Sequence, residues 1–166
     1  MKKTALDAID IRILSALQQN GSVSKSKLAE LVNLSPTPCW VRLAKLKKNG
    51  FIKGYRTDID INSIVDFTKV IVTVSLKNHQ TSDFKLFESY IHSVDNIVEC
   101  DATGGGFDYV LKVIARNLAN FQDLIEQLLN ANIGIERYFI YIVTRQIKSS
   151  LPNLLTLIGD QSPLSS

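Results

Sequence analysis

The stretch LSPTPCWVR, residues 34–42, decides the fold of the N-terminal third of this chain. Ser35 is a residue type that caps helix starts, Pro36 suits the first helical position, and Gly50 is a typical stop. We therefore predict a helix from about Pro36 to Asn49. This helix is amphipathic and basic, so the face that carries Cys39, Leu43 and Leu46 is expected to be buried and the opposite face to stay exposed.

Two shorter helices are predicted before this segment. Apolar residues recur at helical spacing from Leu6 to Leu17, and Gly21 ends that pattern. Ser24 is the expected cap of a second helix over residues 25–32. Asn33 falls in the joining turn, where asparagine tolerates a left-handed backbone. Two helices joined by a tight turn, the second of them basic, predict a helix-turn-helix that binds DNA.

The pattern changes from helical to alternating in the rest of the chain. Phe51–Arg56 is expected to form a short strand or wing. From residue 68 the expected order is a strand, a helix, two strands joined by Gly104-Gly105-Gly106, a second helix and a long final strand over Ile135–Ile147. This βαββαβ order is that of a ferredoxin-like domain.

The expected fold class is therefore α+β. Its parts are a winged-helix-like helix-turn-helix domain over residues 1–56, a linker over 57–67, a ferredoxin-like domain over 68–148 and a tail over 149–166.

The charge distribution separates the same two parts. Eleven of the 19 basic residues but only three of the 16 acidic residues lie within residues 1–56, although the net charge is only +3. A basic first part favours a nucleic-acid partner. The hydrophobic fraction of 45% is that of a folded globular protein. No apolar run approaches the ~20 residues of a membrane helix, and acidic residues interrupt any secretory signal, so we expect a cytoplasmic protein without a membrane partner.

Both faces of the predicted sheet are apolar. The segment Arg137–Val143 is apolar or aromatic on both alternating faces, and Val70–Val74 is nearly so. Helices cover only one face of such a sheet, so the other face needs a cover as well. We expect a second copy of the sheet to supply it. The alternative is that the tail segment Leu151–Ile158 folds back over it.

The exposed side of the basic helix suits a major groove. Thr37 can hydrogen-bond a base edge, Val41 can contact a thymine methyl, and Lys45 and Lys48 can reach phosphates. Trp40 can pack against the protein instead of contacting DNA, and Arg42 can pair with Asp10 or Glu30 instead of a phosphate. The candidate DNA-binding residues are Ser35, Thr37, Pro38, Trp40, Val41, Arg42, Lys45 and Lys48.

The sequence resembles the leucine-responsive regulatory protein/AsnC family. The resemblance rests on the run Ser35–Trp40, on the segment Gly50–Tyr55, and on Gly105-x-Phe107-Asp108-Tyr109 in the second part. It extends from about Leu6 to Lys148. Members of that family are transcription regulators that join a helix-turn-helix to a ligand-sensing domain.

The resemblance implies an amino acid or similar small metabolite as effector, bound between the sensing domains of neighbouring dimers. It also implies homodimers that assemble to octamers and associate with the nucleoid. The implied effector residues are Asp101, Thr103, Gly104, Gly105, Gly106, Asp108, Tyr141 and Ile142. The three glycines leave few side chains to hold an amino group, so Asp108 and Asp101 are the candidates for that role, and a different ligand or none remains an alternative.

The leading hypothesis is thus a sequence-specific transcription regulator that binds double-stranded DNA and responds to a small molecule. The alternative is a nucleoid-architectural DNA-binding protein without an effector. An enzyme is not expected, because no nucleophile elbow or phosphate loop is present. No cofactor is implied, and the two cysteines and two histidines lack the short spacing of a metal site.

Overall fold

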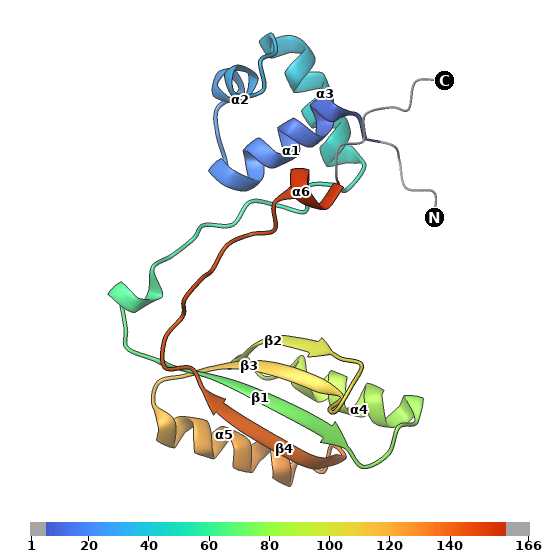
Figure 1. Cartoon of the computed structure of the whole chain (residues 1–166), viewed down its shortest axis with the longest axis vertical. Helices are drawn as coiled ribbons and strands as arrows, with labels where there is room; N and C mark the ends of the chain where they lie inside the picture. Colours follow the sequence, from blue (N-terminus) through green and yellow to red (C-terminus); the bar gives the residue numbers. More distant parts are fainter. Residues whose placement is uncertain (1–5, 159–166) are drawn as a thin grey trace. The chain divides into compact units, whose positions relative to one another are not determined.

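The computed structural model describes residues 6–158, and the chain divides into two compact units (Figure 1). Unit one contains the residues up to Ile59 together with those from Lys148 onward, and unit two contains Asp60–Ile147. Residues 1–5 of the expected DNA-binding domain and residues 159–166 of the expected tail lie outside the described residues. In the described part, no helix combines the length and apolar character needed to cross a membrane.

Unit one begins with the three expected helices. They are α1 (Ala8–Asn20), α2 (Lys25–Leu31) and α3 (Pro36–Lys48). The side chain of Asp7 caps α1 by accepting hydrogen bonds from the backbone N–H groups of Ile9 and Asp10, and Ser24 caps α2 in the same way. Asn33 has a φ of +54°, which confirms the predicted left-handed turn.

A single apolar cluster holds these three helices together. Each helix contributes the residues that recur at helical spacing, and on α3 these are the predicted Cys39, Leu43 and Leu46. The cluster consists of Ile13, Leu17, Leu28, Ala29, Val32, Cys39, Leu43 and Leu46. Because one side of α3 is used for this packing, its other side stays on the surface.

The last described helix, α6 (Leu154–Ile158), also belongs to unit one. It contacts α1, while Leu155 and Leu157 on it remain exposed. The contacts of the tail are therefore made with the helical unit. They do not support the alternative in which this segment covers the sheet.

Unit two has the predicted βαββαβ order. Its elements are β1 (Thr68–Leu76), α4 (Thr81–Ile91), β2 (Ile97–Ala102), β3 (Tyr109–Ala115), α5 (Leu118–Asn130) and β4 (Ile135–Ile142), preceded by the short 3₁₀ helix η1 (Ile61–Ser63). The strands lie in the order β2-β3-β1-β4, and every neighbouring pair is antiparallel (Figure 1). The expected α+β fold class is confirmed.

Helices α4 and α5 pack on one face of this sheet. The alternate residues Val70, Val72, Val74 and Leu76 of β1 are buried there in one cluster with Phe87 of α4 and with Phe121 and Leu128 of α5. The opposite face, which we call the open face, carries Ile71 and Thr73 of β1. Their partners on β4 are Tyr141 and Phe139, whose side chains are 55% and 51% exposed. Large apolar side chains therefore lie uncovered on the open face.

Two predicted strands differ from the structure. Phe51–Arg56 has no strand conformation, and the final strand ends at Ile142 instead of Ile147. A strand needs a neighbour to satisfy its backbone N–H and C=O groups. Within the described residues β1 pairs with this strand as far as Ile142, with one further hydrogen bond from the Val143 N–H to the Lys69 carbonyl, and no strand faces Phe51–Arg56. Both predictions were based on side-chain pattern alone, which does not show where a pairing partner ends.

Candidate nucleic-acid interface and effector site

The exposed side of α3 forms what we call the reading face, and the side chains of Thr37, Pro38, Val41, Ala44, Lys45 and Lys48 are all exposed on it. Val41 is the clearest case, with 62% of its surface accessible although it is apolar. An exposed valine flanked by a threonine and lysines is the composition expected of a helix that enters a major groove.

Ser35 precedes α3, but its side chain does not cap the helix. An N-cap side chain normally accepts a hydrogen bond from the backbone N–H of the second or third helical residue. The third residue here is Pro38, which has no N–H, and the Ser35 side chain makes no capping bond in the structure. Ser35 is therefore the N-cap residue of α3, as predicted, but its side chain supplies no capping hydrogen bond. Ser35 is exposed in front of the reading face, which suits the predicted contact with DNA.

The lysines of unit one differ in whether they already have a partner. Lys27 pairs with Glu30 at 3.1 Å, and the ammonium of Lys47 lies 5.1 Å from the centre of the Tyr55 ring. Within residues 6–158, Lys45 and Lys48 form no ion pair. These two charges on the reading face are thus available to a polyanion.

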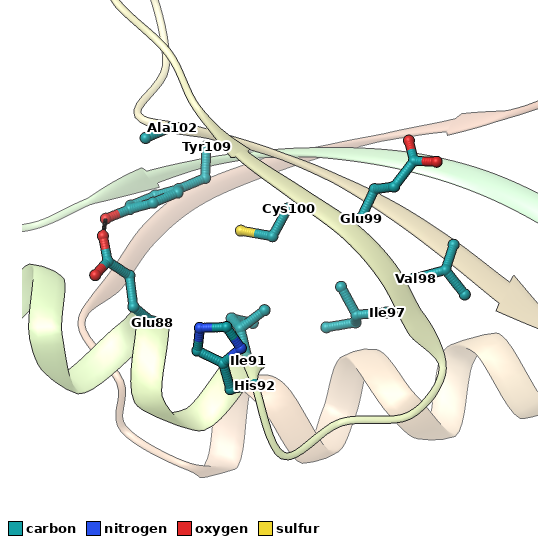
Figure 2. Close-up of a pocket in the computed structure, with 9 residues that line it drawn as sticks. All are labelled: Glu88, Ile91, His92, Ile97, Val98, Glu99, Cys100, Ala102 and Tyr109. Carbon is teal, nitrogen blue, oxygen red and sulfur yellow. Dashed lines mark hydrogen bonds between the residues drawn. The ribbon is translucent and has the colours of Figure 1, made fainter. Parts of the chain in front are cut away.

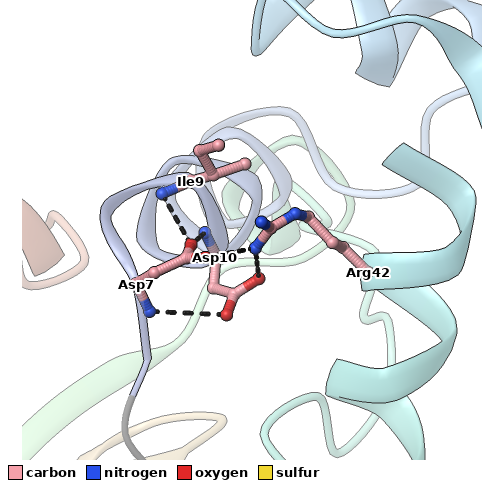
Figure 3. A network of polar contacts seen from close by, with 4 residues as sticks. All are labelled: Asp7, Ile9, Asp10 and Arg42. Carbon is pink, nitrogen blue, oxygen red and sulfur yellow. Dashed lines mark hydrogen bonds and ion pairs between the residues drawn. The ribbon is translucent and has the colours of Figure 1, made fainter. Parts of the chain in front are cut away.

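Arg42 lies beside the reading face and is engaged by acidic residues of α1. Its Nη1 donates to Oδ2 of Asp7 at 2.5 Å and to Oδ1 of Asp10 at 2.9 Å (Figure 3). Hydrogen bonds from Asp10 N–H and Arg42 hold the pKa of Asp7 below its ordinary value, and the two carboxylates raise the pKa of Arg42. The alternative of pairing with Asp10 is therefore realised, whereas Glu30 pairs with Lys27.

Trp40 has a partner that sequence reasoning missed. The ammonium of Lys25, at the start of α2, lies 3.6 Å from the centre of a Trp40 ring. This is a cation–π contact, typically about 0.5–1 kcal/mol at an exposed site. Trp40 itself is 41% exposed, so it packs only partly. Periodicity could not reveal this contact, because it joins two helices across the turn.

The predicted effector loop, residues 103–108, joins β2 to β3. Thr103 closes it by donating from its N–H to the Asp108 carbonyl and from its hydroxyl to the Phe107 carbonyl. The glycines between them are exposed, and no hydrogen bond in residues 6–158 uses their N–H groups. Gly105 has a φ of +151°, a conformation that favours glycine. The loop thus presents free backbone donors, a feature suited to binding an anion.

The carboxylate of Asp108 already has protein partners. Its Oδ2 accepts the N–H of Leu76 at 2.8 Å, and Nε2 of His79 lies 3.1 Å from Oδ1. Asp108 therefore ties the loop to the end of β1 and to the segment before α4. Asp101, the other candidate for holding an amino group, is exposed on β2.

The effector residues on β4 lie away from this loop within one chain. Tyr141 and Ile142 pair with Ile71 and Val70, whereas Asp108 hydrogen-bonds Val74, three residues along β1 from Ile71. That separation corresponds to roughly 10 Å along a strand. Register also places Tyr141 and Ile142 on opposite faces of the sheet. A single chain therefore does not bring the two predicted groups together.

A cavity of about 370 Å³ lies between α4 and β2 (Figure 2). The Tyr109 hydroxyl donates to Glu88 Oε1 at 2.8 Å inside it, and burial together with Glu88 raises the Tyr109 pKa. Burial likewise raises the pKa of the Cys100 thiol. Of the predicted effector residues none lines this cavity, whose walls are Glu88, Ile91, His92, Ile97, Val98, Glu99, Cys100, Ala102 and Tyr109.

Fold and site together define a class of protein. A helix-turn-helix unit with an exposed basic helix is joined to a ferredoxin-like unit with a donor-rich loop, which is the organisation of a DNA-binding regulator with a separate ligand-binding domain. Residues 69–152 match the model of the Lrp/AsnC ligand binding domain, and residues 6–53 match that of a winged helix-turn-helix DNA-binding domain. The chain belongs to the Lrp/AsnC family of transcription regulators.

Individual relatives agree with this assignment. The chain is 43% identical over 143 residues to the transcriptional regulatory protein DoeX of Halomonas elongata, covering 86% of this chain and 90% of that one. It is 36% identical to the leucine-responsive regulatory protein of Haemophilus influenzae, covering 94% and 93% of the two chains.

Solved structures are similar as well. An AsnC family transcriptional regulator from Agrobacterium tumefaciens has a TM-score of 0.83 and 27% identity, with 92% of this chain and 99% of that one covered. A transcriptional regulator from Neisseria meningitidis, solved as a complex with L-methionine, also has a TM-score of 0.83, with 28% identity and coverage of 93% and 99%.

Proposed function

We propose that this regulator binds operator DNA by inserting the reading face of α3 into a major groove. The observation that carries this proposal is the exposed reading face itself, in which Val41 is uncovered and Lys45 and Lys48 have no acidic partner in the described part of the chain. Thr37 and Val41 contact base edges, and the two lysines contact phosphates on either side.

The pair formed by Lys25 and Trp40 extends this interface to α2. Because the indole holds the Lys25 ammonium close to α3, that charge is positioned before DNA arrives and loses less side-chain entropy on binding. Ser35 and Pro38 lie at the N-terminal end of the same surface, where a helix-turn-helix approaches the bases. We therefore add Lys25 to the predicted DNA-binding residues, and we leave Arg42 out of that set because two carboxylates already pair with it.

The effector in this proposal is an amino acid or related metabolite with a carboxylate. The unused N–H groups of Gly104, Gly105 and Gly106 bind that carboxylate. Because one chain keeps Tyr141 and Ile142 about 10 Å from the loop along β1, a neighbouring chain supplies this part of the site, with the side chain of one of the two, since they lie on opposite faces of the sheet. The L-methionine complex of the Neisseria meningitidis regulator supports this class of ligand.

Self-association follows from the open face. Phe139 and Tyr141 are both more than half exposed there, and the Thr73 hydroxyl is buried among its neighbours without a hydrogen-bond partner. A second copy of the sheet covers these groups in a homodimer. We propose that such dimers assemble further to octamers, and that the protein acts on the nucleoid as a regulator and not as a catalyst.

Fluorescence anisotropy with a labelled duplex from the region upstream of the protein's own gene tests the DNA-binding proposal. We expect tight binding that survives excess unrelated duplex. Equal affinity for the two duplexes would contradict sequence-specific binding and favour an architectural role.

A thermal-shift screen of the amino acids tests the effector proposal. At least one of them should raise the melting temperature, and Gly106→Ala should reduce that rise, because its methyl group enters the open space beside the N–H groups that bind the carboxylate. An added Cβ at Gly106 meets no atom within 4 Å and the φ there is not positive, so this variant is expected to fold. Gly54→Ala, equally open but in unit one, is the matched control. A flat screen across all amino acids would reject this effector class.

A further inference from the structure

We propose that Arg42 is a positioning residue for DNA binding, which sets α3 through Asp7 and Asp10 instead of contacting a phosphate. This inference rests on the proposed DNA-binding role of the reading face. It assigns Arg42 a different task from Lys45, although both carry a positive charge on the same helix.

The geometry of the ion pairs supports this assignment. One nitrogen of Arg42, Nη1, donates to both carboxylates, and the Arg42 side chain is only 32% exposed. Asp10 is 11% exposed, so its charge is largely withdrawn from water. An ion pair with a buried member resists exchange for an outside partner, because breaking it leaves that member uncompensated.

The two carboxylates are themselves fixed by the first turn of α1 (Figure 3). Oδ1 of Asp7 accepts the N–H groups of Ile9 and Asp10, at 2.9 and 2.8 Å. The carboxylate of Asp10 accepts the N–H of Asp7 in return. The partners of Arg42 are thus anchored to the backbone, so the contact ties α3 directly to the start of α1.

The location of this network explains why DNA binding depends on it. Asp7, Asp10 and Arg42 line one surface hollow together with Thr37, Val41 and Lys45 of the reading face. Contacts to base edges require placement to about 0.5 Å. The ion pairs of Arg42, next to Val41 in the chain, hold in place the half of α3 that carries those contacts.

The charges of these three residues are a second reason to assign Arg42 a role other than phosphate contact. The two aspartates and the arginine together carry one excess negative charge, so the group as a whole does not attract phosphate. Without Arg42, two uncompensated carboxylates would share a hollow with the reading face and repel the duplex. Lys45 lines the same hollow but forms no ion pair with either carboxylate, so it does not neutralise them.

The experiment is a mutant cycle in DNA affinity, measured by anisotropy on the full chain. Its variants are Arg42→Gln, the double variant Asp7→Asn with Asp10→Asn, and the triple variant. Asparagine caps helices as well as aspartate does, so the double variant keeps the start of α1 and removes only the charges. The matched control is Glu30→Gln with Asp58→Asn, which removes two exposed acids elsewhere in unit one.

If Arg42 positions α3 through the aspartates, removing their negative charges should weaken DNA binding instead of strengthening it. The Asp7/Asp10 double variant binds DNA several-fold more weakly, although it has lost two negative charges, while the control binds equally well or more tightly. Arg42→Gln weakens binding by about tenfold, and the triple variant is no weaker than Arg42→Gln, because the three residues act as one coupled unit. Arg42→Gln also leaves the salt dependence of binding unchanged, since no phosphate contact is lost.

The opposite results would overturn the inference. If the double variant binds as tightly as the parent or more tightly, the aspartates do not position α3. If Arg42→Gln causes the same loss with and without the aspartates, or lowers the salt slope by about 0.9, Arg42 is itself a phosphate contact. Should Arg42→Gln fail to fold, the double variant and its control still decide the question. If the parent protein itself does not bind DNA, the proposed function is rejected instead.

Discussion

The salt dependence of DNA binding should reveal two phosphate contacts at the exposed end of α3. Lys45 and Lys48 have no ion-pair partner within residues 6–158, so both are free to displace counterions from DNA. Each phosphate contact contributes about 0.9 to the slope of log Kd against log salt concentration, so Lys45→Ala with Lys48→Ala should lower the slope by about 1.8. The advantage of the parent over this variant should then shrink about 12-fold between about 50 and about 200 mM salt.

The assay is an anisotropy titration of one duplex at several salt concentrations. The control variant, Lys27→Ala with Lys47→Ala, removes the same charge from two lysines that already contact Glu30 and Tyr55. It should leave the slope near that of the parent. Equal slopes for the Lys45/Lys48 variant and the parent would refute the reasoning, because they would mean that neither lysine meets a phosphate.

Three further outcomes are expected. Phe139→Glu with Tyr141→Glu should lower the sedimentation coefficient to that of a monomer, whereas Leu86→Glu, an exposed apolar residue on α4, should not; a monomeric parent would contradict this. Hydrogen bonds hold the pKa of Asp7 below its ordinary value, so ionised Asp7 stabilises the folded protein above about pH 4, and this stabilisation is lost as the pH falls through the lowered pKa. The melting temperature of Asp7→Asn should therefore fall less steeply than that of the parent between neutral and acidic pH. Phe87→Ala should destabilise unit two by about 3–5 kcal/mol in chemical unfolding, since the Phe87 ring is fully buried and its centre lies 4.5 Å from that of the tilted Tyr109 ring. A loss below about 1 kcal/mol would contradict this expectation.

Local chemistry made much of unit one predictable. Asn33 was expected in a left-handed turn, and Cys39, Leu43 and Leu46 were expected in the core, because both expectations follow from residue type and helical period. Ser35 shows the limit of that approach. Ser35 occupies the predicted N-cap position, but Pro38 removes one of the two N–H groups that its side chain could use, and the capping hydrogen bond is absent.

Contacts between distant residues were less accessible. The sequence allowed Arg42 to meet either a phosphate or an acid, and only the fold brings it to Asp7, 35 residues earlier in the chain. Likewise nothing in the alternation of apolar residues indicates that Lys25 lies over Trp40. In unit two, the order of elements was predictable from the change in period. The end of β4 was not, because it depends on where its partner β1 stops.

The effector site illustrates the same limit at the level of assembly. The family resemblance implied that the loop at 103–108 belongs to the effector site, and its glycines have unused N–H groups in the structure. The strand register then separates that loop from Tyr141 within one chain. The proposed site takes residues from two chains, and the sequence pattern of one chain does not show how two chains meet.

Site-specific photocrosslinking tests the central claim most directly. A benzophenone side chain placed at position 41, on the reading face of α3, should crosslink efficiently to an operator duplex, while the same group at position 12, on the exposed side of α1, should not. Crosslinks from position 12 but not from position 41 would show that DNA meets another surface, and would contradict the account.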